Sequence, residues 1–334
     1  MWEQQLWMPL VMIRCYTILC ILLCNAYCAA QKITFLDAQT QNPVSFATIS
    51  FGDGLGTFAN AEGEFTFDKK RYADVDSLFV SGMGYKPLAL STSSLQSQYE
   101  MEQNIDQLKE VVLVAPRTGK FKKKQQKPIS HTDYFQSWLP TVESEVAVRF
   151  NEYNGQPTQI STLLLPVNTQ EEFDGKKGRS RPFSTLLRVQ FYDNNNNLPG
   201  NEIPYGNIVF VVTEDFDDDV FELDVEAYNI FIPDDGLFVS LQVLGHADEK
   251  GNLIESKKYN EIKTKQGIRK ISITFRPLLP FTNEVSGEQT FVRRVFFNNK
   301  KWQPYNFKYN PNSKLLLEGY NNYAMGAKFH VYED

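Results

Sequence analysis

The sequence predicts an all-β protein made of two β-sandwich domains, and three observations lead to this prediction. Short runs that alternate apolar and polar residues recur along the chain, as in Phe65-Thr66-Phe67 and Arg188-Val189-Gln190-Phe191. Aromatic residues make up 13% of the chain and often fall inside these runs, as strand propensity favours. Gly, Pro, Asn and Asp separate the runs, which is typical of turns between strands.

Residues 1–30 have the pattern of a signal peptide. Cys15 to Cys24 is an almost unbroken apolar run, too short for a stable transmembrane helix, and Cys28 and Ala30 place small residues at a cleavage site after Ala30. The start of translation stays open between Met1 and Met12, because Met12 would put a basic residue directly before the apolar run. We therefore expect an exported protein.

The remaining composition excludes several functions. All four cysteines lie before residue 31, so the mature chain has no disulfides, thiol nucleophiles or cysteine metal ligands. Its net charge stays at -6 because Glu3 and Arg14 cancel within the signal, which argues against nucleic-acid binding. After residue 31 there is no apolar stretch long enough to cross a membrane.

Residues 117–130 form a predicted basic linker between the two domains. Six basic residues lie between Pro116 and Pro128 without an acidic one: Arg117, Lys120, Lys122, Lys123, Lys124 and Lys127. We interpret the segment as a solvated spacer whose charges repel one another. The alternative is a basic strip for anionic lipid or polysaccharide.

The first domain, residues 31–116, is expected to hold seven short strands in a small sandwich. Asn42-Pro43, Asp53-Gly54 and Glu62-Gly63 supply turns, and only Ser93 to Gln98 has the pattern of a helical turn. The predicted strands are 32–37, 44–51, 56–59, 64–67, 77–81, 87–91 and 110–114.

Several segments of this domain, in order, resemble the carboxypeptidase regulatory-like domain of the transthyretin-like, immunoglobulin-like sandwich class. The matching segments are Asp37 to Val44, Ala47 to Ile49, Gly56 to Phe65, Asp76 to Ser81, Gly84 to Lys86 and Leu108 to Val112. The resemblance implies an accessory, non-catalytic module of envelope proteins in Bacteroidota-like bacteria. In many of these the last segment leads into a TonB-dependent receptor, but about 220 further residues are too few for such a barrel.

The second domain, residues 131–334, is expected to be a larger, jelly-roll-like sandwich. Leu186 to Asp193 alternates well, and Gly236 to Gly245 is a long apolar run suited to a central strand. A looser resemblance links this domain to sandwich modules appended to bacterial surface proteins, and it carries no ligand site. The predicted strands are 145–151, 159–166, 184–193, 206–213, 219–225, 229–232, 236–245, 269–275, 291–297 and 326–332.

Two motifs imitate catalytic or phosphate sites. His246 and Glu249 form a His-x-x-Glu pair with His330 as a possible third zinc ligand, but they fall on a polar hairpin tip. Gly52 to Gly56 imitates a phosphate loop but leads into a strand, so we interpret it as a β-turn. The chain has three histidines and no Gly-x-Ser-x-Gly motif for a serine hydrolase.

Two further features leave a ligand possible. Asp193 to Asn197 and the acidic residues Asp215, Asp217, Asp218 and Asp219 could bind calcium, although a solvated loop closed by Pro199-Gly200 is the simpler interpretation. A C-terminal aromatic group could stack on sugars, although core packing is more usual. This group comprises Trp302, Tyr305, Phe307, Tyr309, Tyr320 and Tyr323.

Taken together, these features predict a non-enzymatic envelope protein, periplasmic, outer-membrane-associated or at the cell surface. We expect no catalytic residues and no cofactor, and the sequence leaves a metal site undetermined. The expected partner is an envelope protein or polysaccharide, with peripheral membrane association possible and no nucleic acid. The alternatives are an accessory component of a TonB-linked outer-membrane machine or an auxiliary enzyme acting on glycans or peptides.

Overall fold

The computed structural model describes residues 30–104, 119–170, 172–173, 175–178, 182–255, 259–297 and 301–333. Nearly all of its regular structure is β, which confirms the predicted all-β fold. Residues 1–29 of the expected signal peptide and the predicted strand at 110–114 lie outside the described residues. In the described part of the chain, none of the helices is long and apolar enough to cross a membrane.

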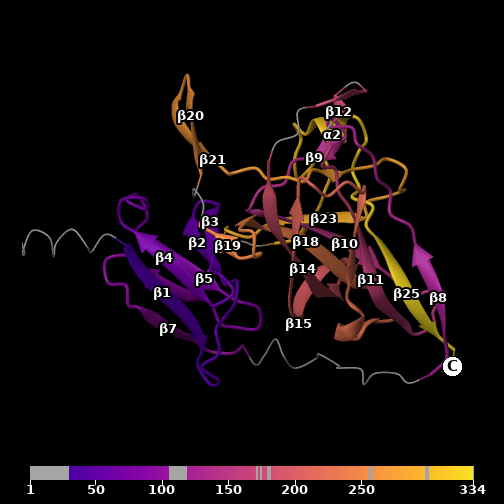
Figure 1. The fold of residues 1–334 in the computed structure, drawn as a ribbon, viewed down its shortest axis with the longest axis horizontal. Coiled ribbons are helices and arrows are strands. Elements are labelled where there is room, and N and C mark those ends of the chain that lie inside the picture. Colours follow the sequence, from indigo (N-terminus) through magenta and orange to yellow (C-terminus); the bar gives the residue numbers. More distant parts are fainter. Residues whose placement is uncertain are drawn as a thin grey trace, which may run out of the picture.

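The first part of the chain forms the N-terminal sandwich, on the left in Figure 1. A three-stranded sheet of order β4-β1-β7 faces a four-stranded sheet of order β3-β2-β5-β6. Alternating residues such as Ile33, Phe35, Ile49, Leu78 and Val80 fill the space between the two sheets. The strands are β1 (Ala30–Asp37), β2 (Thr48–Gly52), β3 (Leu55–Phe58), β4 (Glu64–Asp68), β5 (Ser77–Ser81), β6 (Leu88–Ser91) and β7 (Gln98–Met101).

Strand β7 is absent from the sequence prediction, which placed a helical turn just before it. It pairs in parallel with β1. Residues 93–97 form a turn and irregular backbone instead of helix, and Gln98 already belongs to β7. Asp37, the last residue of β1, connects several segments of this region through hydrogen bonds. Its Oδ1 accepts the backbone N–H of Thr40 at 2.7 Å. Its Oδ2 accepts hydrogen bonds from Gln103 at 2.7 Å and from the Tyr85 hydroxyl at 2.9 Å. These donors hold the pKa of Asp37 well below its usual range, the Thr40 N–H most strongly.

The rest of the chain forms the C-terminal sandwich. Its larger sheet has the order β15-β14-β18-β10-β23-β24 with β19 beside β18, and its smaller sheet has the order β16-β11-β25-β8 with β17 beside β11. The larger sheet contains β10 (Ser144–Phe150), β14 (Ser184–Asn195), β15 (Leu198–Thr213), β18 (Leu237–Ala247), β19 (Leu253–Ile254), β23 (Thr290–Arg294) and β24 (Gln303–Pro304). The smaller sheet contains β8 (Phe121–Gln126), β11 (Thr158–Pro166), β16 (Val220–Asp224), β17 (Ile230–Ile232) and β25 (Gly326–Tyr332).

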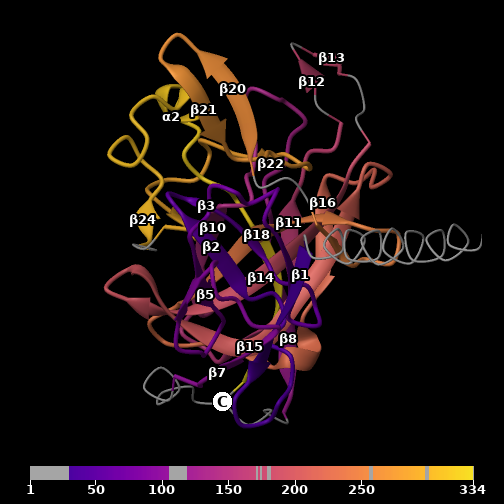
Figure 2. The same ribbon diagram turned by 90° about the vertical axis from the view of Figure 1, so that its left-hand side faces the viewer.

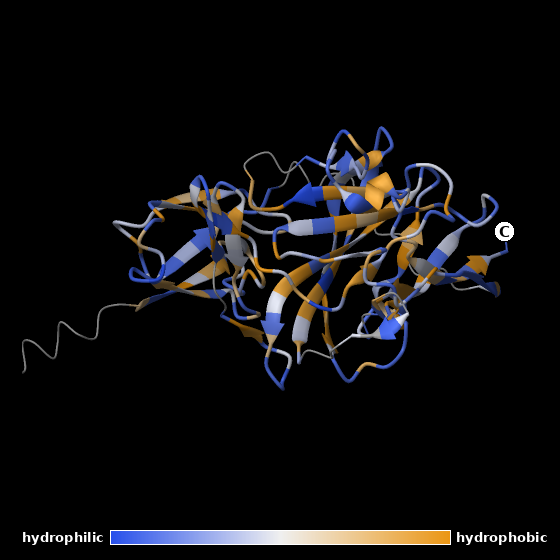
Figure 3. Cartoon of the chain, turned by 90° about the horizontal axis from the view of Figure 1, so that it is seen from above, coloured by the Kyte–Doolittle hydropathy of each residue, from blue (hydrophilic) through white to orange (hydrophobic). Residues whose placement is uncertain are grey.

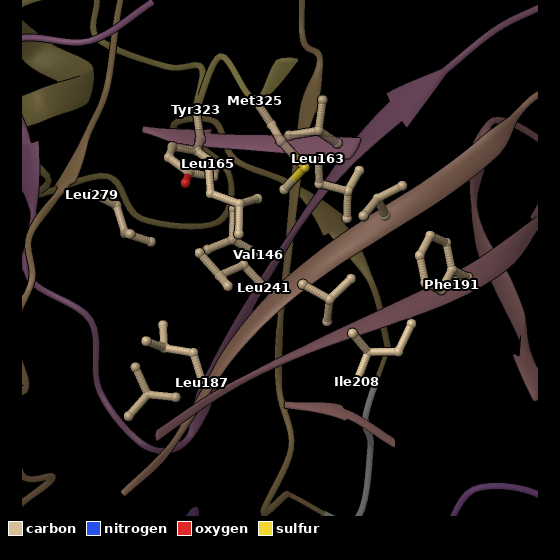
Figure 4. Packing of buried hydrophobic residues seen from close by; sticks show 14 of the residues in the cluster. Val146, Leu163, Leu165, Leu187, Phe191, Ile208, Leu241, Leu279, Tyr323 and Met325 are labelled. Atoms are coloured by element: carbon tan, nitrogen blue, oxygen red, sulfur yellow. The ribbon is translucent and has the colours of Figure 1, made fainter. Parts of the chain in front are cut away.

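The core of this sandwich lies between its two sheets. Val146 and Leu241 from the larger sheet meet Leu163, Leu165 and Met325 on the other side (Figure 4). Hydrophobic segments lie along the strands and hydrophilic ones in most connecting loops (Figure 3). The remaining elements are β9 (Ser137–Trp138), β22 (Leu279–Pro280), β12 (Glu172–Phe173), β13 (Lys176–Lys177), β20 (Asn260–Thr264), β21 (Gly267–Ile271), η1 (Glu226–Tyr228) and α2 (Lys314–Leu317).

The interpretation of residues 117–130 as a spacer is wrong for its central part. Residues 121–126 form β8, which pairs antiparallel with β25 at the edge of the smaller sheet. Lysines at an edge strand oppose pairing with a second chain, so the same charges that suggested a spacer fit an edge strand. Lys122 forms an ion pair with Glu333 at 2.7 Å.

The strand predicted at residues 269–275 begins and ends earlier in the structure, and it does not join either sheet of the C-terminal sandwich. Residues 267–271 form β21, which pairs only with β20 in a two-stranded hairpin. This hairpin projects from the body in two perpendicular views (Figure 1, Figure 2). Its isoleucines Ile262, Ile268 and Ile271 are exposed, whereas Phe275, at the end of the predicted strand, is buried and lies outside the hairpin.

Candidate functional site: a polar cleft between the sandwiches

The outer face of the larger sheet carries polar residues that are buried or, for Arg293, partly buried. We call them the polar row: Arg188, Gln190, Gln242, Glu145 and Arg293. Strand register aligns them, because Arg188 lies opposite Gln242, Gln242 opposite Glu145, and Glu145 opposite Arg293. Successive side chains of a strand point to opposite faces. The inward neighbours on the same strands belong to the apolar core, so the polar row lies on the other side of the sheet.

The N-terminal sandwich covers part of this face. Arg188 donates through Nη1 to the backbone carbonyl of Phe46 at 3.2 Å. Ser50 donates to the carbonyl of Phe296 at 2.5 Å, and the rings of Phe58 and Phe296 have centroids 5.4 Å apart. These buried contacts join segments more than 140 residues apart in the sequence.

The glycine-rich segment Gly52 to Gly56 forms the turn between β2 and β3 and belongs to this contact. A Cβ atom at Gly56 would lie 2.5 Å from the Phe296 ring, and one at Gly54 would overlap the ring of Phe297. Gly54 also has a positive φ of 79°, which favours glycine. The glycines therefore allow the turn to approach the second sandwich closely.

A charged cluster closes one end of the polar row. Glu145 is fully buried and accepts hydrogen bonds from the Tyr192 hydroxyl at 2.7 Å, Ser240 at 2.6 Å and Arg293 Nε at 2.6 Å. Arg293 also binds Glu202 at 3.1 Å. Such a charge needs these partners, because an unpaired buried carboxylate is strongly unfavourable.

Two groups of this cluster, Tyr192 and Arg293, have raised pKa values. Burial raises the pKa of Tyr192 well above its usual value, so the hydroxyl remains a donor to Glu145. Burial alone would lower the pKa of Arg293, but the attraction of Glu145, Tyr192 and Glu202 outweighs it and the pKa is raised. Around neutral pH Tyr192 therefore stays uncharged and Arg293 stays positively charged.

Next to the polar row lies a cleft with a volume of about 540 Å³. Its polar floor comes from the larger sheet and its hairpin, through Arg188, Gln190, Asn201, Glu202, Gln242 and Arg293. The opposite wall comes from the N-terminal sandwich and includes Thr48, Phe79, Met83, Tyr85, Pro87 and Leu88. The size is within the usual range for small-molecule sites.

Three floor residues carry polar atoms without a hydrogen-bond partner in the part of the chain that the structure describes. These atoms are Arg188 Nε, Gln190 Oε1 and Gln242 Nε2, and their residues are 5%, 3% and 1% exposed. Arg188 Nη2 donates to Gln242 Oε1 at 2.6 Å, which turns the amide NH₂ of Gln242 away from the arginine. An unsatisfied buried polar group costs about 1–3 kcal/mol, so a ligand that bonds them would gain affinity.

The His-x-x-Glu residues, which we weighed as zinc ligands and interpreted as part of a polar turn, do not form a site with His330. His246 lies near the end of β18, with its ring 4.8 Å from that of Phe275, and Glu249 lies in the turn that follows. His330 lies on β25 in the other sheet and stacks on Phe121 at 3.9 Å. The described residues include no group of three or more His, Cys, Asp or Glu side chains arranged to hold a metal ion.

The asparagine-rich segment forms a tight hairpin turn. Asn196 and Asn197 have positive φ values of 54° and 64° between the paired residues Asn195 and Leu198, as a two-residue type I′ turn requires. The interpretation that Pro199-Gly200 closes a solvated loop is wrong, because both lie within β15. β15 is an edge strand of its sheet, where proline is tolerated.

The C-terminal aromatic group is mostly core. Trp302 is 8% exposed, Tyr305 3% and Tyr323 1%, whereas Phe307 is 50% exposed. Tyr305 and Tyr323 both pack against Phe281. The bulk of the group is therefore not a surface for sugar stacking.

The acidic residues from Asp215 to Asp219 lie in the connection between β15 and β16. The backbone carbonyl of Asp219 accepts the N–H of Val167 at 2.9 Å. This bond ties the connection to the end of β11 and gives the segment a structural role.

The sequence prediction located β14, β18 and β23 of the cleft floor, but it missed the first half of β15, which carries Asn201 and Glu202, and it missed the cleft. A signal was present: Gln242 and Ser240 interrupt the apolar run at 236–245, and Arg188 and Gln190 share one face of the strand at 184–193. Polar residues inside a buried strand are informative because they need partners. No protein-family model, curated protein or solved structure matches this chain, so the resemblance of residues 32–114 to the carboxypeptidase regulatory-like domain stays a prediction.

Proposed function

We propose that the protein is an exported, non-enzymatic binding protein of the cell envelope that holds a small polar ligand in the cleft between its sandwiches. The observation that carries the proposal is the set of unpaired atoms on Arg188, Gln190 and Gln242. All three residues line the cleft. Buried polar atoms almost always have partners in folded proteins, and a ligand would supply them here.

Two carboxylates, Glu202 in the cleft lining and Glu145 behind Arg293, support binding rather than catalysis. Glu145 uses both oxygens in hydrogen bonds and is fully buried, and Glu202 pairs with the same arginine, Arg293. A general acid or base must reach its substrate within hydrogen-bond distance. We interpret both groups as charge partners that fix the position of Arg293.

The export part of the proposal comes from the apolar segment before residue 31 and the absence of cysteine after it. Fractionation of native cells, with N-terminal sequencing of the recovered protein, tests it. We expect a chain that starts at residue 31 in an envelope fraction. Recovery of a full-length chain in the cytoplasm would contradict export.

Native mass spectrometry of the mature chain, incubated with a small-molecule extract of cell envelopes, tests the binding part. We expect an adduct on the wild type that is lost from Gln242→Leu, because leucine cannot donate to the ligand. The matched control is Gln96→Leu, an exposed glutamine outside the cleft, which should keep the adduct. An adduct that persists in Gln242→Leu would remove the cleft from the proposal.

A second candidate is an accessory component of an outer-membrane machine that acts through protein contacts. The β20–β21 hairpin favours it, because this hairpin projects from the body (Figure 1) and exposes Ile262, Ile268 and Ile271. Crosslinking in native cells, with all three isoleucines changed to serine, tests this candidate. Loss of one specific crosslinked protein on the triple change would support it, and an unchanged crosslinking pattern would contradict it.

A further inference from the structure

We infer that the ligand of the cleft is an uncharged carbohydrate, a conclusion that rests on the proposed binding function and specifies its chemistry. Three properties of the cleft lead to this class: the balance of its charges, the mixture of donors and acceptors on its floor, and the apolar character of the opposite wall.

The first property is charge balance. Arg293 is bonded to two carboxylates, Glu145 and Glu202, which leaves this group with one negative charge. Arg188, on the same sheet face, contributes one positive charge. The four groups together are neutral, so a ligand with a net charge would add a charge without a counter-charge in a partly desolvated site.

The second property is the arrangement of the unpaired atoms. Arg188 Nε and Gln242 Nε2 are donors, whereas Gln190 Oε1 is an acceptor. Gln242 lies directly opposite Arg188 on the neighbouring strand. A hydroxyl group both donates and accepts, so adjacent hydroxyls of a sugar satisfy a mixed set of this kind without a charged group.

The third property is the wall that faces the floor. Phe79 on β5 is 39% exposed, and Met83, Pro87 and Leu88 continue the apolar surface beside it. A sugar ring has hydroxyls at its edge and C–H groups on its faces. It would direct its hydroxyls to the polar floor and pack a C–H face against this wall.

An extended peptide fits the floor less well. Peptides often bind by adding a strand to a free sheet edge. β14 lies between β15 and β18, and β18 lies between β14 and β10, so the two strands that carry Arg188, Gln190 and Gln242 already have partners on each side. The edge strand β15 contributes Asn201 and Glu202 to the floor. The unpaired atoms on β14 and β18 belong to side chains, which favours a ligand recognised through its hydroxyls.

The test is isothermal titration calorimetry of the mature full-length chain with three sets of probes: neutral oligosaccharides, oligosaccharides that contain uronic acid, and uncharged capped tripeptides. We expect binding of a neutral oligosaccharide and a loss of affinity of about tenfold or more in Gln190→Leu, the equivalent of one hydrogen bond to a buried group. Gln96→Leu, outside the cleft, should bind like the wild type. Thr48→Val, on the opposite wall, gives a second test that conserves volume if Gln190→Leu fails to fold.

The outcomes separate this inference from the proposed function. Neutral oligosaccharide binding that falls in the cleft variants but not in Gln96→Leu supports both. Preference for acidic oligosaccharides or for tripeptides, with the same sensitivity to Gln190→Leu, overturns the carbohydrate class and leaves a binding cleft. Absence of binding to all three probe sets, or binding that the cleft variants leave unchanged, overturns the inference.

Discussion

The two sandwiches bury polar groups in different ways. In the N-terminal sandwich the buried carboxylate of Asp37 lies at the end of a strand and is held by neutral donors. In the C-terminal sandwich the buried carboxylate of Glu145 lies within a strand and is held by the charged side chain of Arg293. The first arrangement fastens a turn, whereas the second places charge and unpaired polar atoms beside a cleft.

Stability alone does not explain the second arrangement. Replacing a buried ion pair by apolar residues often leaves stability unchanged or raises it. An outer sheet face covered by another sandwich could be apolar, yet Arg188, Gln190 and Gln242 lie there with unpaired atoms. The polar row is therefore consistent with the proposed ligand binding, and variants at single residues of the two sandwiches test the contrast.

The largest expected effect is at Glu145. Glu145→Gln removes the charge that neutralises Arg293 in a buried position, and we expect the free energy of unfolding to fall by about 3–5 kcal/mol. Urea denaturation followed by tryptophan fluorescence measures it. Glu202→Gln, which removes the more exposed partner of the same arginine, should cost less than about 1 kcal/mol. Equal losses in the two variants would contradict the assigned roles.

The next effect concerns the contact between the sandwiches. Gly56→Ala places a Cβ atom against the Phe296 ring and the backbone of Ile49, and we expect a loss of stability of about 1–3 kcal/mol with weaker ligand binding in the cleft. Thermal denaturation and calorimetric titration measure the two effects. The control is Gly119→Ala, whose added Cβ has a nearest neighbour at 3.8 Å and should change neither. Unaltered stability in Gly56→Ala would show that the sandwiches do not pack closely at this turn.

A smaller effect concerns the pH dependence of the Asp37 carboxylate in the N-terminal sandwich. The pKa of Asp37 is lowered in the folded state, so its contribution to stability is full above the unfolded pKa of about 3.9 and is lost as the pH falls below that value. We expect Asp37→Asn to reduce this acid-dependent part of unfolding, measured by urea denaturation between about pH 6 and pH 3. An unchanged pH dependence in Asp37→Asn would show that other groups cause the acid sensitivity.

Local patterns predicted much of the fold, and long-range pairing explains most of what they missed. Alternation and turn residues located strands such as 64–67, 77–81 and 326–332 within one or two residues of their observed bounds. They could not show that β7 pairs in parallel with β1 or that the basic segment pairs with the C-terminal strand. The cleft was missed for the same reason, since Arg188 and Phe46 are brought together only by packing of the sandwiches.

The smallest expected effect on stability is at the β8 edge, where Lys122, Lys123 and Lys124 face solvent or lie at the rim. Changing all three to threonine should alter the free energy of unfolding by about 1 kcal/mol or less, because exposed ion pairs contribute little. The edge strand would, however, lose the charges that oppose pairing with a second chain. We therefore expect self-association that rises with concentration in sedimentation velocity, whereas the same change at Lys69, Lys70 and Lys250, which lie in turns, should leave the sedimentation of the protein unchanged. If both variants sedimented alike, the lysines of β8 would have no protective role, and a binding role for this basic strand would become the better explanation.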